Sequence, residues 1–183
     1  MPNHEQREEE FSFKQYFVPL TTLKAIHWIV IIGLIVYANM RFNGFVWDDY
    51  SYIINNPEVH KINILYSFQK NFFNVEGQYR AFTELYFSIL YSLFTTNAFF
   101  YHIVQLLIHL INSVLIFLLF RKFFKPINAF FLSLIFLIHP IQVESVSYIS
   151  ATGGILCFLL GIIILFLYSP EKIHYRRIIL MTL

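Results

Sequence analysis

Two adjacent carboxylates, Asp48 and Asp49, stand in the aromatic stretch "FVWDDYSYIINNP", directly behind an apolar run. Neighbouring carboxylates repel each other, so either one of them becomes a better base or a divalent cation binds between them and neutralises both. A solvated loop without chemistry is the alternative, because acidic residues are usually exposed to water. The elements that position the pair decide between these interpretations.

Other polar side chains occur within the apolar runs or at their ends. Four share one face of a single apolar run, at spacings of three, four and three residues: His102, Gln105, His109 and Asn112. Polar residues of a membrane helix usually face the bundle interior, which favours packing contacts over a site. His139 and Glu144 lie one turn apart beside Pro140, and a site or the end of a helix at an interface explains them equally well.

The composition indicates a membrane protein. Of 183 residues, 57% are hydrophobic and 13% are charged, whereas about a quarter of the residues of a soluble domain are charged. The net charge is +2, and Lys and Arg form short clusters beside apolar runs, so we expect no nucleic-acid partner. The single cysteine, Cys157, excludes a disulfide within the chain.

The apolar runs predict an all-α, polytopic membrane protein with about four transmembrane helices and the start of a fifth, since a span takes about 20 residues. A polar cytoplasmic segment, 1–24, precedes the first span. The runs 126–143 and 145–170 each suit one helix. Within 82–95, Glu84, Ser88 and Ser92 repeat opposite an apolar face, which predicts an amphipathic helix at the membrane interface. The second span then covers about 98–120.

The basic residues test this topology through the positive-inside rule. With a cytoplasmic N-terminus, nine Lys and Arg residues fall inside, and four fall on the external loop 41–80: Arg41, Lys61, Lys70 and Arg80. A model in which 85–120 crosses twice with an external N-terminus satisfies the rule equally well. The amphipathic face of 82–95 favours the first arrangement.

Five segments, in this order, resemble GT-C-type membrane glycosyltransferases, in particular the amino-terminal part of the tetratricopeptide-containing transmembrane O-mannosyltransferases and their bacterial relatives. They are "FVWDD", "NNP", "QYRAFTELYF", "FYHIVQLLIHLINS" and "LIFLIHPIQVESVSYIS". Two departures are Ala81-Phe82 where the family has Pro-Leu after its arginine, and an uncharged "SATGGIL" where it has Gly-Arg-x-Asp. Residues 25–183 would form part of a GT-C-like transmembrane domain, and the end at "IILMTL" suggests a fragment or truncated copy.

This resemblance implies transfer of a sugar from a polyprenyl-phosphate-linked donor to an acceptor protein or glycan on the external side. The protein would be a multi-pass membrane protein, in contact with membrane lipid, in the plasma membrane of a bacterium or the endoplasmic reticulum membrane of a eukaryote. A non-catalytic membrane module, or a component that transports a lipid-linked substrate, is the alternative function.

Each polar candidate has a role under this resemblance. Asp48 would be the catalytic base and Asp49 would support it, with a divalent cation between them as the one metal that the pair could bind. Arg80, beside Tyr79, would bind the leaving phosphate. The remaining substrate-binding candidates are His102, His139 and Glu144.

Overall fold

The computed structural model describes residues 20–73 and 80–168, and every regular element within these ranges is helical. The expected all-α class is therefore confirmed for the described part of the chain. Three predictions fall largely or wholly outside it: the cytoplasmic segment 1–24, the start of a fifth span after residue 170, and the role of Tyr79.

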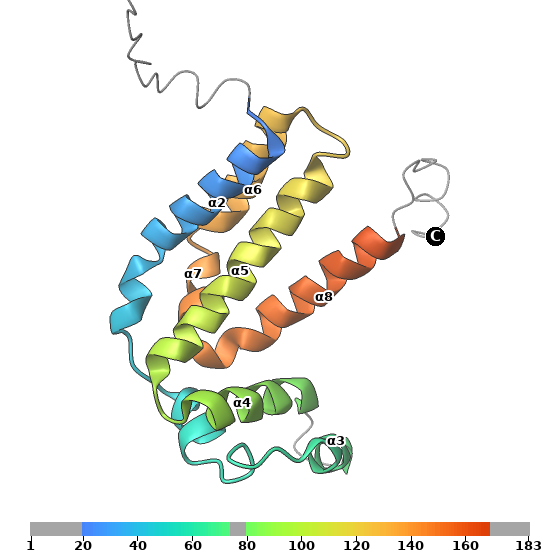
Figure 1. The fold of residues 1–183 in the computed structure, drawn as a ribbon. Helices are drawn as coiled ribbons and strands as arrows, with labels where there is room; N and C mark the ends of the chain where they lie inside the picture. The colour runs from blue at the N-terminus through green and yellow to red at the C-terminus, as the bar shows by residue number, and fades with distance from the viewer. Residues whose placement is uncertain (1–19, 74–79, 169–183) are drawn as a thin grey trace, which may run out of the picture.

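The bundle is built around one central helix, α5 (Ala98–Phe120), which begins and ends where the sequence predicted. Asn97 explains its start, because its side chain accepts a hydrogen bond from the Phe99 N–H at 3.2 Å. Three helices pack against α5: α2 (Thr22–Val36), α6 (Pro126–Ile138) and α8 (Thr152–Tyr168). Figure 1 shows α2, α5 and α6 side by side, whereas α8 diverges from the bundle toward its C-terminal end.

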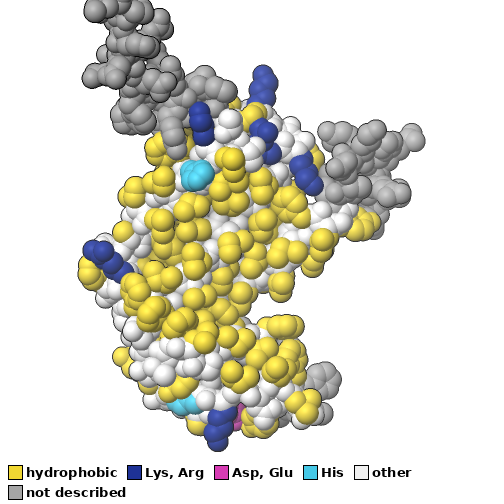
Figure 2. Space-filling model, in the orientation of Figure 1, with side chains coloured by type: hydrophobic (Ala, Val, Ile, Leu, Met, Phe, Trp, Pro, Cys, Tyr) yellow, Lys and Arg dark blue, Asp and Glu magenta, His cyan; other side chains and the backbone are white. Residues whose placement is uncertain are grey.

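Two helices are long and apolar enough to cross a membrane, namely α5 and the continuous helical stretch Ile149–Tyr168 that contains α8. The first expected span, which follows the segment 1–24, and the span expected within 126–143 form the shorter apolar helices α2 and α6. Figure 2 shows a broad hydrophobic band over the middle of the molecule, with most of the visible Lys and Arg beyond one end of it. This surface supports a location in a membrane.

The runs 126–143 and 145–170 each contain one long apolar helix as predicted, but the first helix is shorter than its run. Helix α6 ends at Ile138 because Pro140 follows His139, whose backbone is extended with φ −63° and ψ 133°. Its 13 residues rise about 20 Å, which is less than the roughly 30 Å of a hydrocarbon core. The short helix α7 (Gln142–Ser147) and the 3₁₀ turn η3 (Ile149–Ala151) separate α6 from α8.

The expected external loop 41–80 contains more structure than the sequence indicated. It holds the end of a 3₁₀ turn, a π-helical turn and a helix that were not predicted: η1 (Ala38–Phe42), η2 (Tyr50–Ile54) and α3 (Ile64–Phe73). These elements lie at the end of the bundle where α8 begins (Figure 1). The acidic pair therefore lies between helical elements, with η1 before it and η2 and α3 after it.

The helix expected at 82–95 is present as α4 (Ala81–Phe94), and it runs across the end of the bundle (Figure 1). Its buried side includes the polar Ser88, whereas the apolar Phe82 and Leu93 are 64% and 65% exposed. Phe82, Ile89 and Leu93 thus point away from the protein. Phe87 and Leu90, on another side of α4, are buried. The position of α4 at a membrane interface stays a prediction, although this orientation suits one.

Candidate functional site

Asp49 is a buried anchor, with only 1% of its surface exposed. One carboxylate oxygen accepts a hydrogen bond from the Val46 N–H at 2.9 Å. The other accepts from the Ser150 N–H at 2.9 Å and from the Ser150 hydroxyl. Hydrogen bonds to a charged acceptor are stronger than neutral ones, so Asp49 ties its own segment to a residue 101 positions away.

Asp48 has the opposite environment, because its side chain is exposed. Its backbone N–H donates to the Tyr148 hydroxyl at 3.3 Å, and the Tyr148 ring contacts the ring of Trp47 edge-on, with centroids 6.3 Å apart. Trp47 has a φ of 45°, which is unusual for a bulky residue. This left-handed backbone conformation of Trp47 comes directly before Asp48, which is exposed, and Asp49, which is buried.

Tyr148 carries a hydroxyl that stays protonated at neutral pH. Partial burial raises its pKa above the usual value, and the nearby Asp48 carboxylate acts in the same direction, while hydrogen bonds from the Asp48 backbone and Ser150 act against them. A neutral phenol can both accept and donate a hydrogen bond. The exposed carboxylate of Asp48 therefore has a fixed polar neighbour.

His102 lies behind the acidic pair, not beside it at the surface. Its ring is 2% exposed and is close enough to interact electrostatically with Asp49, and the backbone of Asn43 and Gly44 is near. Neither ring nitrogen has a hydrogen-bond partner within the described residues. The predicted contact between His102 and substrate stays a prediction, and a buried ring offers no surface for one in this conformation.

The other polar residues of α5 make packing contacts, as the sequence favoured. The Gln105 amide donates to the carbonyls of Ser145 at 2.9 Å and Tyr148 at 2.8 Å, and its oxygen accepts from the Thr152 hydroxyl at 2.7 Å. His109 and Asn112 bond carbonyls of neighbouring helices in the same way, those of Leu137 and Ile155. Irregular backbone inside a membrane protein needs such partners.

Arg80 is exposed at the start of α4, and its guanidinium carbon lies 4.7 Å from the centroid of the Tyr52 ring. Tyr52 belongs to the turn η2, which directly follows the acidic pair along the chain. The structure thus brings Arg80 to the same segment as Asp48 and Asp49. Tyr79, its expected partner in substrate binding, is not described.

Glu144 and His139 lie in different surroundings. Glu144 is exposed in α7, one turn before Tyr148, whose N–H donates to the Glu144 carbonyl at 3.0 Å. His139 instead stabilises the turn after α6 by accepting a hydrogen bond from the Ile141 N–H at 3.2 Å. Of these two residues, Glu144 is the one that is hydrogen-bonded, through its carbonyl, to Tyr148, which contacts Asp48.

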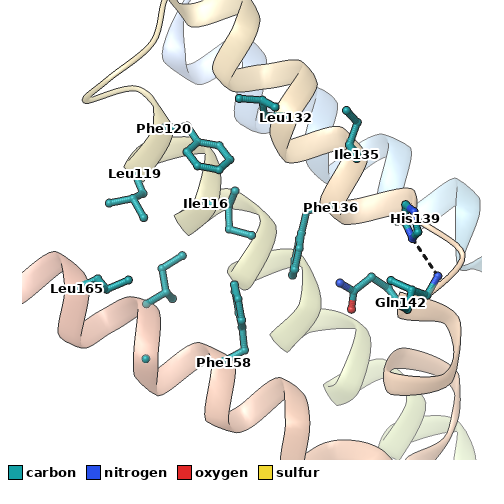
Figure 3. A pocket seen from close by; sticks show the side chains of 13 residues that line it. Ile116, Leu119, Phe120, Leu132, Ile135, Phe136, His139, Gln142, Phe158 and Leu165 are labelled. Atoms are coloured by element: carbon teal, nitrogen blue, oxygen red, sulfur yellow. Dashed lines mark hydrogen bonds between the residues drawn. The ribbon is translucent and has the colours of Figure 1, made fainter. Parts of the chain in front are cut away.

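A large apolar cavity of about 880 Å³ lies between α5, α6 and α8, where α8 diverges from the bundle. Figure 3 shows its lining, in which the stacked rings of Phe136 and Phe158 lie with centroids 5.1 Å apart. His139 and Gln142 are polar members of this lining, which contains neither Asp48 nor Asp49. The cavity is therefore distinct from the acidic site.

The acidic pair is a poor fit for a shared divalent cation. One oxygen of Asp49 already accepts two hydrogen bonds, and the other accepts one. Among the described residues, no group of three or more His, Cys, Asp or Glu side chains gathers at one point. A hard divalent cation normally requires several oxygen ligands, which the described residues around the acidic pair do not gather.

The chain is similar to curated proteins named as protein O-mannosyl-transferases. It is 28% identical to human protein O-mannosyl-transferase TMTC3 over 158 residues, which are 82% of this chain and 17% of that protein. A Caenorhabditis elegans protein O-mannosyl-transferase is 27% identical over 85% of this chain and 24% of its own length. The mouse TMTC3 protein is 25% identical over 92% of this chain and 18% of its own length.

These relatives confirm the resemblance to transmembrane O-mannosyltransferases that the sequence motifs indicated. The chain spans roughly a fifth of their length, between 17% and 24%. No family model matches the chain, and no solved structure matches it significantly.

Two residues of this site, Tyr148 and Ser150, were not predicted from the sequence. Both belong to the segment "SVSYIS" and stand two residues apart. Where a chain is extended, residues at this spacing lie on the same side of it. In the structure their partners are the two neighbouring acidic residues.

Proposed function

We propose that this chain forms the acidic-site region of a membrane glycosyltransferase, which transfers a sugar from a polyprenyl-phosphate-linked donor to a hydroxyl acceptor. By analogy with the names of its relatives, the sugar would be mannose. The observation that carries the proposal is the division of the acidic pair. Asp49 is fixed by three hydrogen bonds, which leaves the neighbouring Asp48 carboxylate exposed on an anchored backbone. A general base requires this combination of fixed position and access to substrate.

In the proposed reaction, the acceptor hydroxyl oxygen attacks the anomeric carbon of the donor sugar. Asp48 takes the hydroxyl proton as the new carbon–oxygen bond forms. The bond between the anomeric carbon and the phosphate oxygen breaks, and the phosphate leaves with the electron pair. Arg80, on the segment that follows the acidic pair, would stabilise the added negative charge on the leaving phosphate.

The membrane arrangement fits a lipid-linked donor. Three apolar residues of α4, Phe82, Ile89 and Leu93, are exposed, and Figure 2 shows the surface hollowed between α4 and α8. A lipid chain would stay in the hydrocarbon region while its phosphate reached the polar end of the bundle. On this proposal the protein crosses the membrane several times and the acidic site faces the external side.

The test is transfer of labelled mannose from polyprenyl-phosphate mannose in membranes that contain the longest available form of the chain. Asp48→Asn should lower turnover by at least about 100-fold, the lower end for loss of a general base. The amount of membrane-inserted protein and its binding of donor should be unchanged. Glu58→Gln is the matched control, because it makes the same chemical change in the same loop while its oxygen can still accept a hydrogen bond from Tyr66.

A second function, binding of a lipid-linked substrate without catalysis, is favoured by the apolar cavity of about 880 Å³ between α5, α6 and α8. Its size and its apolar lining suit part of a lipid chain. The same assay distinguishes the two functions. Donor binding with no transfer by the unaltered protein would support this second function. Wild-type transfer by Asp48→Asn would contradict the role of Asp48 as the base.

A further inference from the structure

The two acidic residues pair with alternate residues of one distant segment. Asp48 contacts Tyr148, and Asp49 contacts Ser150, so the first loop and the connection between α7 and α8 lie side by side over this stretch. The Asp49 contact is buried, whereas the Asp48 contact is at the surface. Only the second contact can influence a carboxylate that substrate can reach.

The backbone and the ring of Tyr148 both make contacts that fix its position. Its carbonyl accepts a hydrogen bond from the Gln105 amide at 2.8 Å, and its N–H donates to the Glu144 carbonyl at 3.0 Å. The ring edge lies against Trp47, and Asp49 fixes Ser150 two residues further on. Since both the backbone and the ring are held, the hydroxyl has a defined position.

The Tyr148 hydroxyl interacts with both the backbone and the side chain of Asp48. It accepts the hydrogen bond from the Asp48 N–H at 3.3 Å. It also lies close enough to the Asp48 carboxylate to interact with it electrostatically, and it keeps its proton at neutral pH. A protonated hydroxyl beside a carboxylate can orient it by donating to one oxygen, which leaves the other free to accept a proton.

We propose that Tyr148 is a positioning residue that orients the Asp48 carboxylate for proton transfer, acting through its hydroxyl and not through its ring. This inference rests on the proposed function, because it assumes that Asp48 is the base. It adds a residue outside the acidic stretch to the machinery of the site. The role requires coupling between Tyr148 and Asp48, which a purely structural tyrosine would not show.

The experiment is a double-mutant cycle with Tyr148→Phe and Asp48→Asn, measured as mannose transfer from polyprenyl-phosphate mannose in membranes. Tyr148→Phe keeps the ring against Trp47 and removes only the hydroxyl. It should lower kcat by about 3- to 10-fold, the size expected for one hydrogen bond, with an unchanged KM for the donor. In the Asp48→Asn background the same change should have no further effect.

Tyr50→Phe is the matched control, because Tyr50 is exposed two residues from Asp48 and its hydroxyl makes no hydrogen bond within the described part of the chain. It should leave kcat unchanged. Each kcat is expressed per mole of folded protein, measured by gel filtration in detergent, so that lost protein is not counted as lost catalysis.

The outcomes separate this inference from the proposed function. Wild-type kcat for Tyr148→Phe, with a large loss for Asp48→Asn, would overturn the positioning role alone. An equal loss from Tyr148→Phe in both backgrounds would also overturn it, because the effect would not pass through Asp48. Wild-type turnover by Asp48→Asn would overturn the proposed base and the positioning role together.

Discussion

Replacement of Asp49 by asparagine tests the assignment of this residue as an anchor. The side chain keeps its size, but one carboxylate oxygen becomes an amide that donates hydrogen bonds. All three groups that now bind Asp49 are donors, namely the Val46 N–H, the Ser150 N–H and the Ser150 hydroxyl. An asparagine therefore cannot satisfy the same set in either orientation.

The loss in stability caused by Asp49→Asn follows from the more favourable of the two orientations of the asparagine amide. With its oxygen toward Ser150, the asparagine amide would face the Val46 N–H, so one hydrogen bond to a charged acceptor is lost and a donor is left without a partner. Each effect costs about 1 to 3 kcal/mol when buried, and Asp49 is 1% exposed. We expect a loss of about 2 to 6 kcal/mol, which corresponds to a fall in Tm of about 4 to 24 °C for a domain of this size.

The measurement is the Tm of the detergent-solubilised protein, followed by the loss of its monodisperse peak in gel filtration after heating. Asp48→Asn is the control, because the Asp48 carboxylate is exposed. Its free energy of unfolding should match that of the wild type within about 0.5 kcal/mol, a Tm difference of about 1 to 2 °C. In a Ser150→Ala background, Asp49→Asn should cost less, since one of its partners is already missing.

Equal Tm values for Asp49→Asn and Asp48→Asn would refute this account of the acidic pair. So would an Asp49→Asn protein of normal stability that has lost transfer activity, because Asp49 would then act on substrate. The expected pattern is a crossover, in which the Asp49 change lowers stability and the Asp48 change lowers turnover.

Three further predictions concern the elements around the pair. Gln105→Leu should lower stability by about 2 to 4 kcal/mol in the same heating assay, because the Ser145 carbonyl loses its side-chain donor and the Tyr148 carbonyl keeps only the Ala151 N–H; an unchanged Tm would contradict this. In a Cys157→Ser background, a cysteine at Lys61 should react with an impermeant thiol reagent from outside and one at Lys122 should not, and the reverse pattern would reject the topology. Glu144→Gln should lower transfer without loss of protein, whereas loss of protein at normal specific activity would make Glu144 structural.

Much of the helical framework could be predicted because the signals are local. The uncharged run 85–120 divides at Asn97, as the change from an amphipathic to a uniformly apolar pattern indicated. The end of α6 at Ile138 could also have been predicted, since Pro140 forces an extended residue before it. Helix α3 was missed because its polar residues suggested a loop, although Ile64, Leu65 and Phe68 are spaced for one helical face.

The different environments of Asp48 and Asp49 could not be predicted from the sequence. Two neighbouring aspartates are chemically identical, and two of the three hydrogen bonds that hold Asp49 come from Ser150, 101 residues further on. The same limit applies to α4, whose polar Ser88 is buried while its apolar Phe82 is exposed. Periodicity identifies two faces of a helix, but the neighbours of the helix decide which face is covered.

The polar face of α5 links the fold to the site. Pro140 and the turns that follow interrupt the helices near Leu137 and Ser145, whose carbonyls accept hydrogen bonds from His109 and Gln105 on α5. The Tyr148 carbonyl accepts from Gln105 as well as from the Ala151 N–H of η3. Inside a membrane each such carbonyl needs a donor, and His109 and Gln105 provide one. Because the Gln105 bond also holds Tyr148, and Tyr148 contacts Asp48, the packing of the bundle extends directly to the exposed carboxylate. Loss of Gln105 should therefore reduce catalysis as well as stability.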